Sequence, residues 1–297
     1  MCAERLAHFK GEIMTALRLS NGIIKDEILV VGLASKQSVR EVSIKEAKTN
    51  LVIENGDVAL DTKKLLAILA DMGATGKCDE VIKIPGFSTR LLVFTGLGEY
   101  KVKYEDETLR RAAGAAARAL AGNSSITLSL PAKRAAAIGA IGEGALLGSY
   151  IFNKFRVDSL NQGHQKLKSV TVHSSLAEDP AAKAAIKRAS IIGEYTALVR
   201  DLINTPPSHL NPESFCADIA EAVKKAGGAS IGLKVSVLNE KQLKAKGFGG
   251  ITAVGQGSIN PPRLLQISYT PAKVESRKSY AYVGKGITFD TGGLALK

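Results

Sequence analysis

Short apolar runs bounded by turn residues alternate along this chain with longer segments of helical periodicity. That alternation is typical of an α/β fold, in which helices cover a sheet of buried strands. The segment 105–120 has the pattern of a helix and opens with three acidic residues, which suit a helix N-terminus. A second helix is predicted over 61–72. The pattern predicts strands over 28–33, 81–84, 91–94, 126–130 and 169–173. These elements form a predicted N-terminal α/β domain, residues 1–176.

A long helix is predicted over 181–203, where Ala, Lys and Arg predominate. It must end at Asn204-Thr205-Pro206-Pro207, because proline cannot continue a helix and restrains the residue before it. We therefore assign residues 177–203 as a linking helix and 204–297 as the beginning of a second α/β domain. In this second domain the pattern predicts helices over 212–226 and 240–246 and strands over 233–238, 263–269 and 279–284.

Composition narrows the class of protein. The chain has 297 residues, of which 45% are hydrophobic, enough for two domains and a sizeable core. No apolar run reaches the roughly 20 residues of a membrane-spanning helix, and the N-terminus has charged residues in place of a signal peptide's apolar region. We predict a cytoplasmic protein. Cys2, Cys78 and Cys216 are scattered singly, which favours structural thiols over a zinc site or a disulfide framework.

The net charge of +12 is unevenly distributed. Residues 1–100 hold 13 basic and 13 acidic side chains, so the whole excess follows position 100. Such an excess can mark a nucleic-acid-binding surface. Here the basic residues are dispersed and no basic run of five occurs. A solvated surface is therefore favoured, and nucleic acid binding stays an open but less favoured alternative.

Two glycine-rich segments are weak candidates for phosphate binding. Gly96-Leu97-Gly98 precedes a predicted helix, but Lys101 occupies the position of the third glycine in a dinucleotide loop, so a structural strand-to-helix turn is favoured. Gly142-Glu143-Gly144, with Gly148, lies in a helical context, where small residues more often permit close packing. Neither segment predicts a nucleotide site.

The strongest candidate for chemistry is the cluster of Lys285, Asp290 and Lys297 around a glycine-rich turn. Asp290 is a hard oxygen ligand placed after a predicted strand, where α/β sheets usually form sites. Beside divalent cations Lys285 would lose its proton and could bind metal, whereas a protonated Lys297 could stabilise charge on a carbonyl oxygen. Physics alone leaves an exposed ion pair as the alternative.

The stretch Val283–Lys297 resembles the Val-Gly-Lys-Gly-Ile-Thr-Phe-Asp-Ser-Gly-Gly-Ile-Ser-Ile-Lys signature of the leucyl aminopeptidase family, cytosolic exopeptidases with two metal ions. Three further segments resemble the family in the same order. They are Glu143–Phe152, then Asp201–Pro207 with Leu210–Pro212, then Val254–Ser258 before Pro261–Arg263. The resemblance covers at least residues 143–297 and identifies the second domain as the first part of an α/β metallopeptidase domain with a mixed sheet.

This resemblance implies a role for each residue of the cluster. Lys285 corresponds to the lysine that binds one metal, Asp290 to the carboxylate that bridges both, and Lys297 to the lysine that contacts the substrate carbonyl. The implied cofactors are two divalent ions (Zn²⁺, Mn²⁺ or Mg²⁺), the implied reaction is release of an N-terminal residue, often leucine, from a peptide substrate, and the implied assembly is a homo-hexamer.

The chain departs from the family at its end. Two aspartates, a glutamate and an arginine that the family places downstream, most of them in an Asn-Thr-Asp-Ala-Glu-Gly-Arg segment, are absent. Because metal affinity depends on ligand count, Lys285 and Asp290 alone should not hold two ions tightly. We expect residues 1–297 to be an incomplete catalytic chain without peptidase activity of its own. Alternatives are a DNA-binding regulatory member of the same family and a non-catalytic ligand-binding module formed by the N-terminal domain.

Overall fold

The computed structural model describes residues 15–22, 28–36, 50–87, 89–156, 165–273 and 278–288. These residues form two compact units, one within residues 11–198 and the other within 199–297. The division falls inside one continuous helix, α6 (Pro180–Asn204), which the sequence predicts over 181–203. In the described part of the chain, no helix combines the length and the apolarity needed to cross a bilayer.

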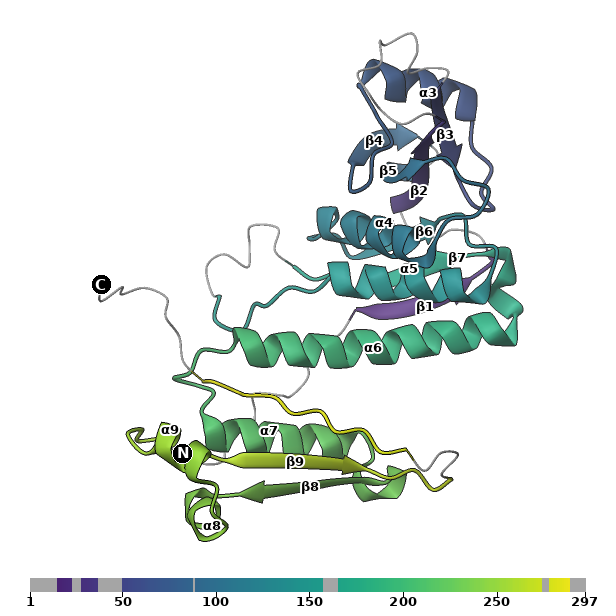
Figure 1. Cartoon of the computed structure of the whole chain (residues 1–297). Coiled ribbons are helices and arrows are strands. Elements are labelled where there is room, and N and C mark those ends of the chain that lie inside the picture. The colour runs from purple at the N-terminus through teal and green to yellow at the C-terminus, as the bar shows by residue number, and fades with distance from the viewer. Residues whose placement is uncertain are drawn as a thin grey trace. The chain divides into compact units, whose positions relative to one another are not determined.

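The unit within 11–198 is built on a seven-stranded mixed sheet (Figure 1). Its strand order is β1-β7-β6-β2-β5-β4, and β3 pairs with β2. The parallel strands are β1 (Ala16–Ser20), β7 (Ser169–His173), β6 (Ser125–Ser129), β2 (Ile28–Ser35) and β5 (Thr89–Glu99). The antiparallel strands are β3 (Leu51–Glu54) and β4 (Val81–Phe87). The predicted α/β class is confirmed.

Strand β2 is the centre of this unit, and all eight of its residues are buried. Side chains of a strand alternate between the two faces of a sheet. Accordingly Ile28 and Val30 pack on one face with α4 (Asp106–Ala119) and α5 (Ala135–Gly148). Leu29, Val31 and Leu33 pack on the other with α3 (Thr62–Asp71). The sheet is thus a middle layer between helices.

Strand β4 forms one edge of this sheet. It carries Pro85, and the next residue, Gly86, has a φ of +73°. Its inner neighbour β5 supplies every described strand pairing of β4. The outer side of β4 is therefore a free sheet edge within the described residues.

The glycines of α5 allow it to approach α4 closely. A Cβ atom added at Gly144 would lie 2.0 Å from the carbonyl oxygen of Arg110, and one at Gly148 would lie 2.2 Å from that of Gly114. Contacts this short are impossible for real side chains, so the helices can pack at this distance only with glycine at these positions. The packing role predicted for the glycines of 142–148 is confirmed.

The Gly96-Leu97-Gly98 segment lies inside β5, so the predicted strand-to-helix turn is wrong. The pairing register of β2 with β5 shifts opposite these residues, and Gly98 has a φ of +78°. A Cβ at Gly96 would lie 1.7 Å from the carbonyl oxygen of Lys77. These glycines accommodate an irregular strand and a close backbone crossing, which a linear pattern of glycines does not distinguish from a turn.

The unit within 199–297 contains a two-stranded antiparallel sheet. After α6 come α7 (Pro212–Lys225), β8 (Leu233–Leu238), α8 (Glu240–Ala245), α9 (Gly249–Gly255) and β9 (Leu264–Tyr269). Single turns of 3₁₀ helix occur at Ser175–Glu178 in the first unit and Gly228–Ile231 in the second. Asparagine caps both α7 and α8, with Asn211 and Asn239 each forming a reciprocal capping box.

The strand predicted over 279–284 is absent: this described segment has no regular secondary structure. Its apolar side chains are solvent-exposed, Tyr282 at 95% and Val283 at 99%. A strand requires a neighbour that accepts and donates its backbone hydrogen bonds. Among the described strands, β9 pairs with β8 and none pairs with 279–284, which explains why an apolar run of strand type does not form a strand here.

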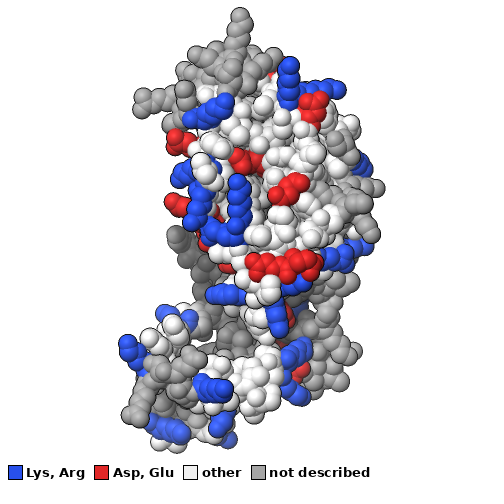
Figure 2. Space-filling view, turned by 90° about the vertical axis from the view of Figure 1, so that its right-hand side faces the viewer, with Lys and Arg blue, Asp and Glu red and all other residues white. Residues whose placement is uncertain are grey.

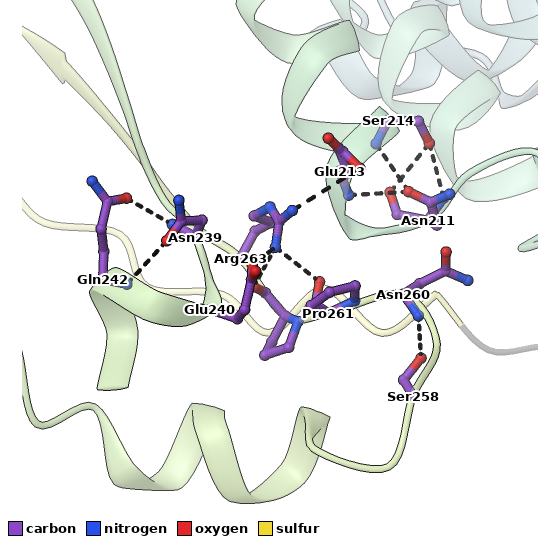
Figure 3. A network of polar contacts seen from close by, with 11 residues as sticks. Asn211, Glu213, Ser214, Asn239, Glu240, Gln242, Ser258, Asn260, Pro261 and Arg263 are labelled. Atoms are coloured by element: carbon purple, nitrogen blue, oxygen red, sulfur yellow. Dashed lines mark hydrogen bonds and ion pairs between the residues drawn. The ribbon is translucent and has the colours of Figure 1, made fainter. Parts of the chain in front are cut away.

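Arg263, directly before β9, connects the elements of this unit (Figure 3). Its side chain is only 13% exposed, and its Nη1 lies 2.7 Å from the Oε2 atom of Glu240 at the start of α8. The same nitrogen donates to the carbonyl of Pro262 at 3.1 Å, while Nη2 lies 4.0 Å from a carboxylate oxygen of Glu213 in α7. One guanidinium thus binds the start of α8 directly and lies at the limit of ion-pair distance from the start of α7.

A first prediction concerns the contact between α4 and α5. Gly144→Ala should destabilise the fold by about 1–3 kcal/mol, because the added methyl group forces the helices apart. Gly250→Ala is the control: it lies in α9 with open space around it, and alanine there should stabilise the helix by about 1 kcal/mol. Urea denaturation followed by circular dichroism measures both. Equal midpoints for the two variants would contradict the close packing.

A second prediction concerns Arg263. Arg263→Ala should destabilise the 199–297 unit by about 1–3 kcal/mol, because the carboxylate of Glu240 and the carbonyls of Pro261 and Pro262 lose a largely buried hydrogen-bond donor. Lys183→Ala, which removes an ion pair to Glu178 between exposed side chains, is the control and should cost less than about 0.5 kcal/mol. Limited proteolysis with thermal unfolding reports the difference. If Arg263→Ala behaves like the control, the guanidinium does not hold these elements together.

Candidate active site

The unit within 199–297 contains a cavity of about 890 Å³. One wall is the end of α6 with the segment that follows it, from Leu202 to Leu210. The start of α7, Arg263 with the start of β9, and the segment Gly284–Thr288 complete it. Segments 80 residues apart in the sequence therefore meet around one space, at the place where the sequence analysis locates its strongest candidate for chemistry.

The first wall is shaped by the prolines that end α6. Thr205 closes the helix: its backbone N–H and its hydroxyl both donate to the carbonyl of Asp201, at 3.0 and 2.6 Å. The chain then turns, with the N–H of Leu210 donating to the carbonyl of Pro206 at 2.9 Å. Asn211 immediately begins α7. These local bonds fix the backbone of the wall without distant contacts.

Arg263 and Cys216 both line the cavity. Cys216 is 6% exposed, and burial raises the pKa of its thiol above the usual value. The positive charge of Arg263 opposes that rise in pKa, and the negative charge of Glu213 adds to it. The thiol is thus a neutral, buried part of the wall, in agreement with the predicted structural role of this cysteine.

Lys285 is the one residue of the predicted cluster that the described structure places, and it lines the cavity. Its side chain is exposed. The flanking Gly284 and Gly286 have nothing within 4 Å of an added Cβ, so this backbone is open to a molecule in the cavity. Asp290 and Lys297 lie outside the described residues, and the structure does not test their positions.

The described residues of the cavity do not by themselves make a site for two divalent ions. Such ions need several oxygen or nitrogen ligands around each metal. The lining contains no aspartate or glutamate, and the described residues contain no group of three His, Cys, Asp or Glu that could hold a metal ion. Any such site therefore depends on residues beyond the described ones.

Sequence reasoning missed the part that Arg263 plays in this cavity. The motif Pro261-Pro262-Arg263 appears in the resemblance without an assigned role. The sequence does contain two signals for that role, the asparagines that cap α7 and α8. Each of these helices carries, in its first turn, an acidic residue that lies near Arg263. The pairing of residues 213, 240 and 263 depends on the tertiary fold, which these signals do not specify.

Comparisons with known proteins match parts of both units. Residues 48–159 match the model of the cytosol aminopeptidase family, N-terminal domain, and residues 197–297 match that of the catalytic domain. A probable cytosol aminopeptidase of Streptomyces avermitilis is 42% identical over 96% of this chain and 56% of its own length. One from Corynebacterium diphtheriae is 41% identical over 96% of this chain and 53% of its length. The chain spans about half the length of the curated relatives it matches.

Solved structures show the same fold. The bottromycin maturation enzyme BotP, in complex with Mn, has a TM-score of 0.61 and 25% sequence identity, covering 83% of this chain and 46% of BotP. A mutant leucine aminopeptidase from tomato has a TM-score of 0.67 and 19% identity, covering 90% of this chain and 53% of that protein. Taken with the two domain matches in the expected order, these findings show that the chain belongs to the cytosol aminopeptidase family, also called the leucyl aminopeptidase family.

Proposed function

We propose that this chain is part of a metal-dependent aminopeptidase that releases N-terminal residues, such as leucine, from peptides. The observation that carries the proposal is the position of Lys285, within the family signature, on the wall of a cavity. Its relatives are named probable cytosol aminopeptidases, and BotP, of similar fold, is described with Mn. These names support a cytoplasmic hydrolase that uses divalent metal.

The proposed roles follow the resemblance residue by residue. Lys285 would bind one of two divalent ions (Zn²⁺, Mn²⁺ or Mg²⁺), and Asp290 would bridge them. Lys297 would remain protonated and stabilise negative charge on the substrate carbonyl oxygen. When bound, two such ions activate a water molecule and bind the free amine of the substrate. The open backbone at Gly284 and Gly286 leaves room for the substrate beside Lys285.

We also propose the domain division of residues 1–176, 177–203 and 204–297, in which the last is an incomplete catalytic domain, and a homo-hexameric assembly. The boundaries rest on the pattern of predicted elements, and the incomplete catalytic domain and the hexamer rest on the resemblance; the two domain matches are consistent with such an order along the chain. With two metal ligands in 204–297, this stretch of chain needs further ligands from elsewhere in the whole protein. The 297-residue chain alone is therefore expected to be inactive.

A nucleic-acid role is not favoured. The lysines of the second unit are spread over α7, β8 and α8, at positions 224, 225, 234, 241, 244 and 246. On the face drawn in Figure 2, acidic side chains lie among the basic ones in the upper part of the view, and the basic side chains in the lower part are separated from one another. A nucleic-acid-binding surface requires a continuous basic patch or stripe. A ligand-binding role for the N-terminal module loses its basis, because Gly96 and Gly98 lie within a strand.

The proposed function makes a third prediction. The reading frame beyond the codon for Lys297 should continue into an Asn-Thr-Asp-Ala-Glu-Gly-Arg segment, and the full product should release leucine from leucine p-nitroanilide only with Mn²⁺, Zn²⁺ or Mg²⁺ present. The 297-residue chain should release none under the same conditions. Sequencing and a colorimetric assay check these outcomes. A full product inactive with all three metals would refute the function, and an active 297-residue chain would refute the requirement for further ligands.

Substitutions in the full product provide a fourth prediction. Lys297→Met should lower kcat about 10²–10³-fold, because one group that stabilises the transition state is lost. Lys285→Met and Asp290→Asn should instead lower the bound metal content, measured by elemental analysis. Lys273→Met, at an exposed lysine of the same unit, is the matched control and should leave both quantities unchanged. Normal metal content in the Lys285 and Asp290 variants would contradict their assigned roles.

A further inference from the structure

Helix α6 has one face that packs on α5 and an opposite face exposed to solvent. On the packed face, Gly139 lies against Ala185, Gly142 against Ile186 and Gly193 against Leu146. Because an α-helix has 3.6 residues per turn, the opposite face is centred on residues seven apart, at 184, 191 and 198. All of these positions belong to the unit within 11–198. The exposed face can therefore be described within this unit alone.

This exposed face is apolar along its centre. Ile191 is 48% exposed, Ala184 is exposed and Leu198 is partly exposed. Tyr195, 39% exposed, and the exposed Arg188 lie along one side of this line. Ala184 and Leu198 are each seven residues from Ile191. If this face packed on an antiparallel copy of itself, the small side chain of Ala184 would lie against the large side chain of Leu198.

The other side of the line carries Lys187 and Glu194, both exposed. Neither forms an ion pair within the described residues. On the helix itself, a partner would have to lie three or four residues away. The positions at that spacing hold no opposite charge for either residue. The two are seven residues apart, an axial rise of about 10.5 Å, too far to pair with each other in one helix.

We infer that this face of α6 binds the same face of a second copy of the chain, antiparallel, about a twofold axis at Ile191. In such a pair, each side of one helix meets the same side of its partner. Lys187 then meets Glu194 of the other copy, because 187 and 194 lie almost equally far from 191. Arg188 meets the ring of Tyr195 in the same way, an arrangement that favours a cation–π contact. Ala184 meets Leu198, a small side chain against a large one.

The self-complementary order is what identifies the occupant as a second copy. An unrelated partner would not require opposite charges placed symmetrically about one apolar residue, whereas a twofold contact requires every group to find its match on the same surface. One helix face is smaller than the roughly 800 Å² per partner of a standard interface. The contact is therefore one part of a larger assembly, and the inference rests on the proposed homo-oligomer but not on peptidase activity.

Disulfide cross-linking tests the axis directly. In a chain with Cys2→Ser and Cys78→Ser, Ile191→Cys should give a covalent dimer on mild oxidation, because packed helix axes 8–10 Å apart leave facing Cα atoms roughly 3.4–5.4 Å from each other, a range that overlaps the Cα separation of a disulfide. Ala184→Cys is the matched control: copies of this position would be about 21 Å apart and should not cross-link. A mixture of Ala184→Cys and Leu198→Cys chains should give the mixed dimer.

The possible outcomes distinguish failure of the proposed α6 contact from failure of the proposed homo-oligomer. Sedimentation of the full product reports whether the whole protein is oligomeric. An oligomer in which Ile191→Cys cross-links no better than Ala184→Cys would overturn the surface while leaving the proposed homo-oligomer intact. A monomer would overturn both. A monomer whose introduced thiol at position 191 is protected from a thiol reagent would show that another part of the same chain covers this face.

A charge exchange tests the ion pair. Glu194→Lys should weaken self-association about tenfold, because two symmetric attractions become repulsions, and adding Lys187→Glu should restore it. Both positions are exposed, so the fold should be unaffected, which circular dichroism verifies. If the double variant is as weak as the single one, Lys187 does not face Glu194 of the other copy and the register is wrong.

Discussion

The two-sided burial of β2 is the constraint on which the larger unit depends. Every side chain of that strand must be covered, and the two faces need different partners because α3 packs on one and α4 with α5 on the other. The run of apolar residues that β2 requires is typical of strands buried on both faces of a sheet. The helices can cover it closely only if they approach each other closely, and the glycines of α5 permit that approach.

The smaller unit is organised by charge instead. It has a two-stranded sheet, and its buried hydrophobic residues are few within the described range. Arg263 connects the start of β9 to Glu240 of α8 and lies near Glu213 of α7, and asparagine caps fix the first turns of both helices. The cavity beside Lys285 borders this network, so the geometry of its wall depends on the integrity of that ionic contact.

Helices and strands were predictable where the local hydrophobic pattern agrees with the burial that the tertiary structure imposes. β7 and β8 occupy the residue ranges that the sequence predicts, and α6 extends one residue beyond each end of its prediction. β1 and β3 were not predicted, because β1 mixes Arg18 with its apolar residues and β3 has only four residues. The strand over 279–284 was predicted wrongly, since apolar pattern reveals strand propensity but not whether a neighbouring strand is available to pair with it.

The candidate site was predictable in part. The glycine-flanked Lys285 could be singled out from the sequence, and it lies on a cavity wall. The cavity itself could not be, because it arises where the end of α6, the start of β9 and residues 284–288 converge, and no local signal encodes that convergence. Asp290 and Lys297, outside the described residues, keep the status of predictions.

The edge strand β4 bears on how the molecule avoids edge-to-edge aggregation. An uncovered sheet edge is a template on which a strand from another molecule can add, and continued addition leads to fibres. Pro85 has no N–H to offer such a strand, and the left-handed backbone at Gly86 breaks the extended line that it would follow. Copies of this chain are thereby discouraged from joining sheet to sheet at β4, whereas a symmetric contact between helices closes on itself and stops.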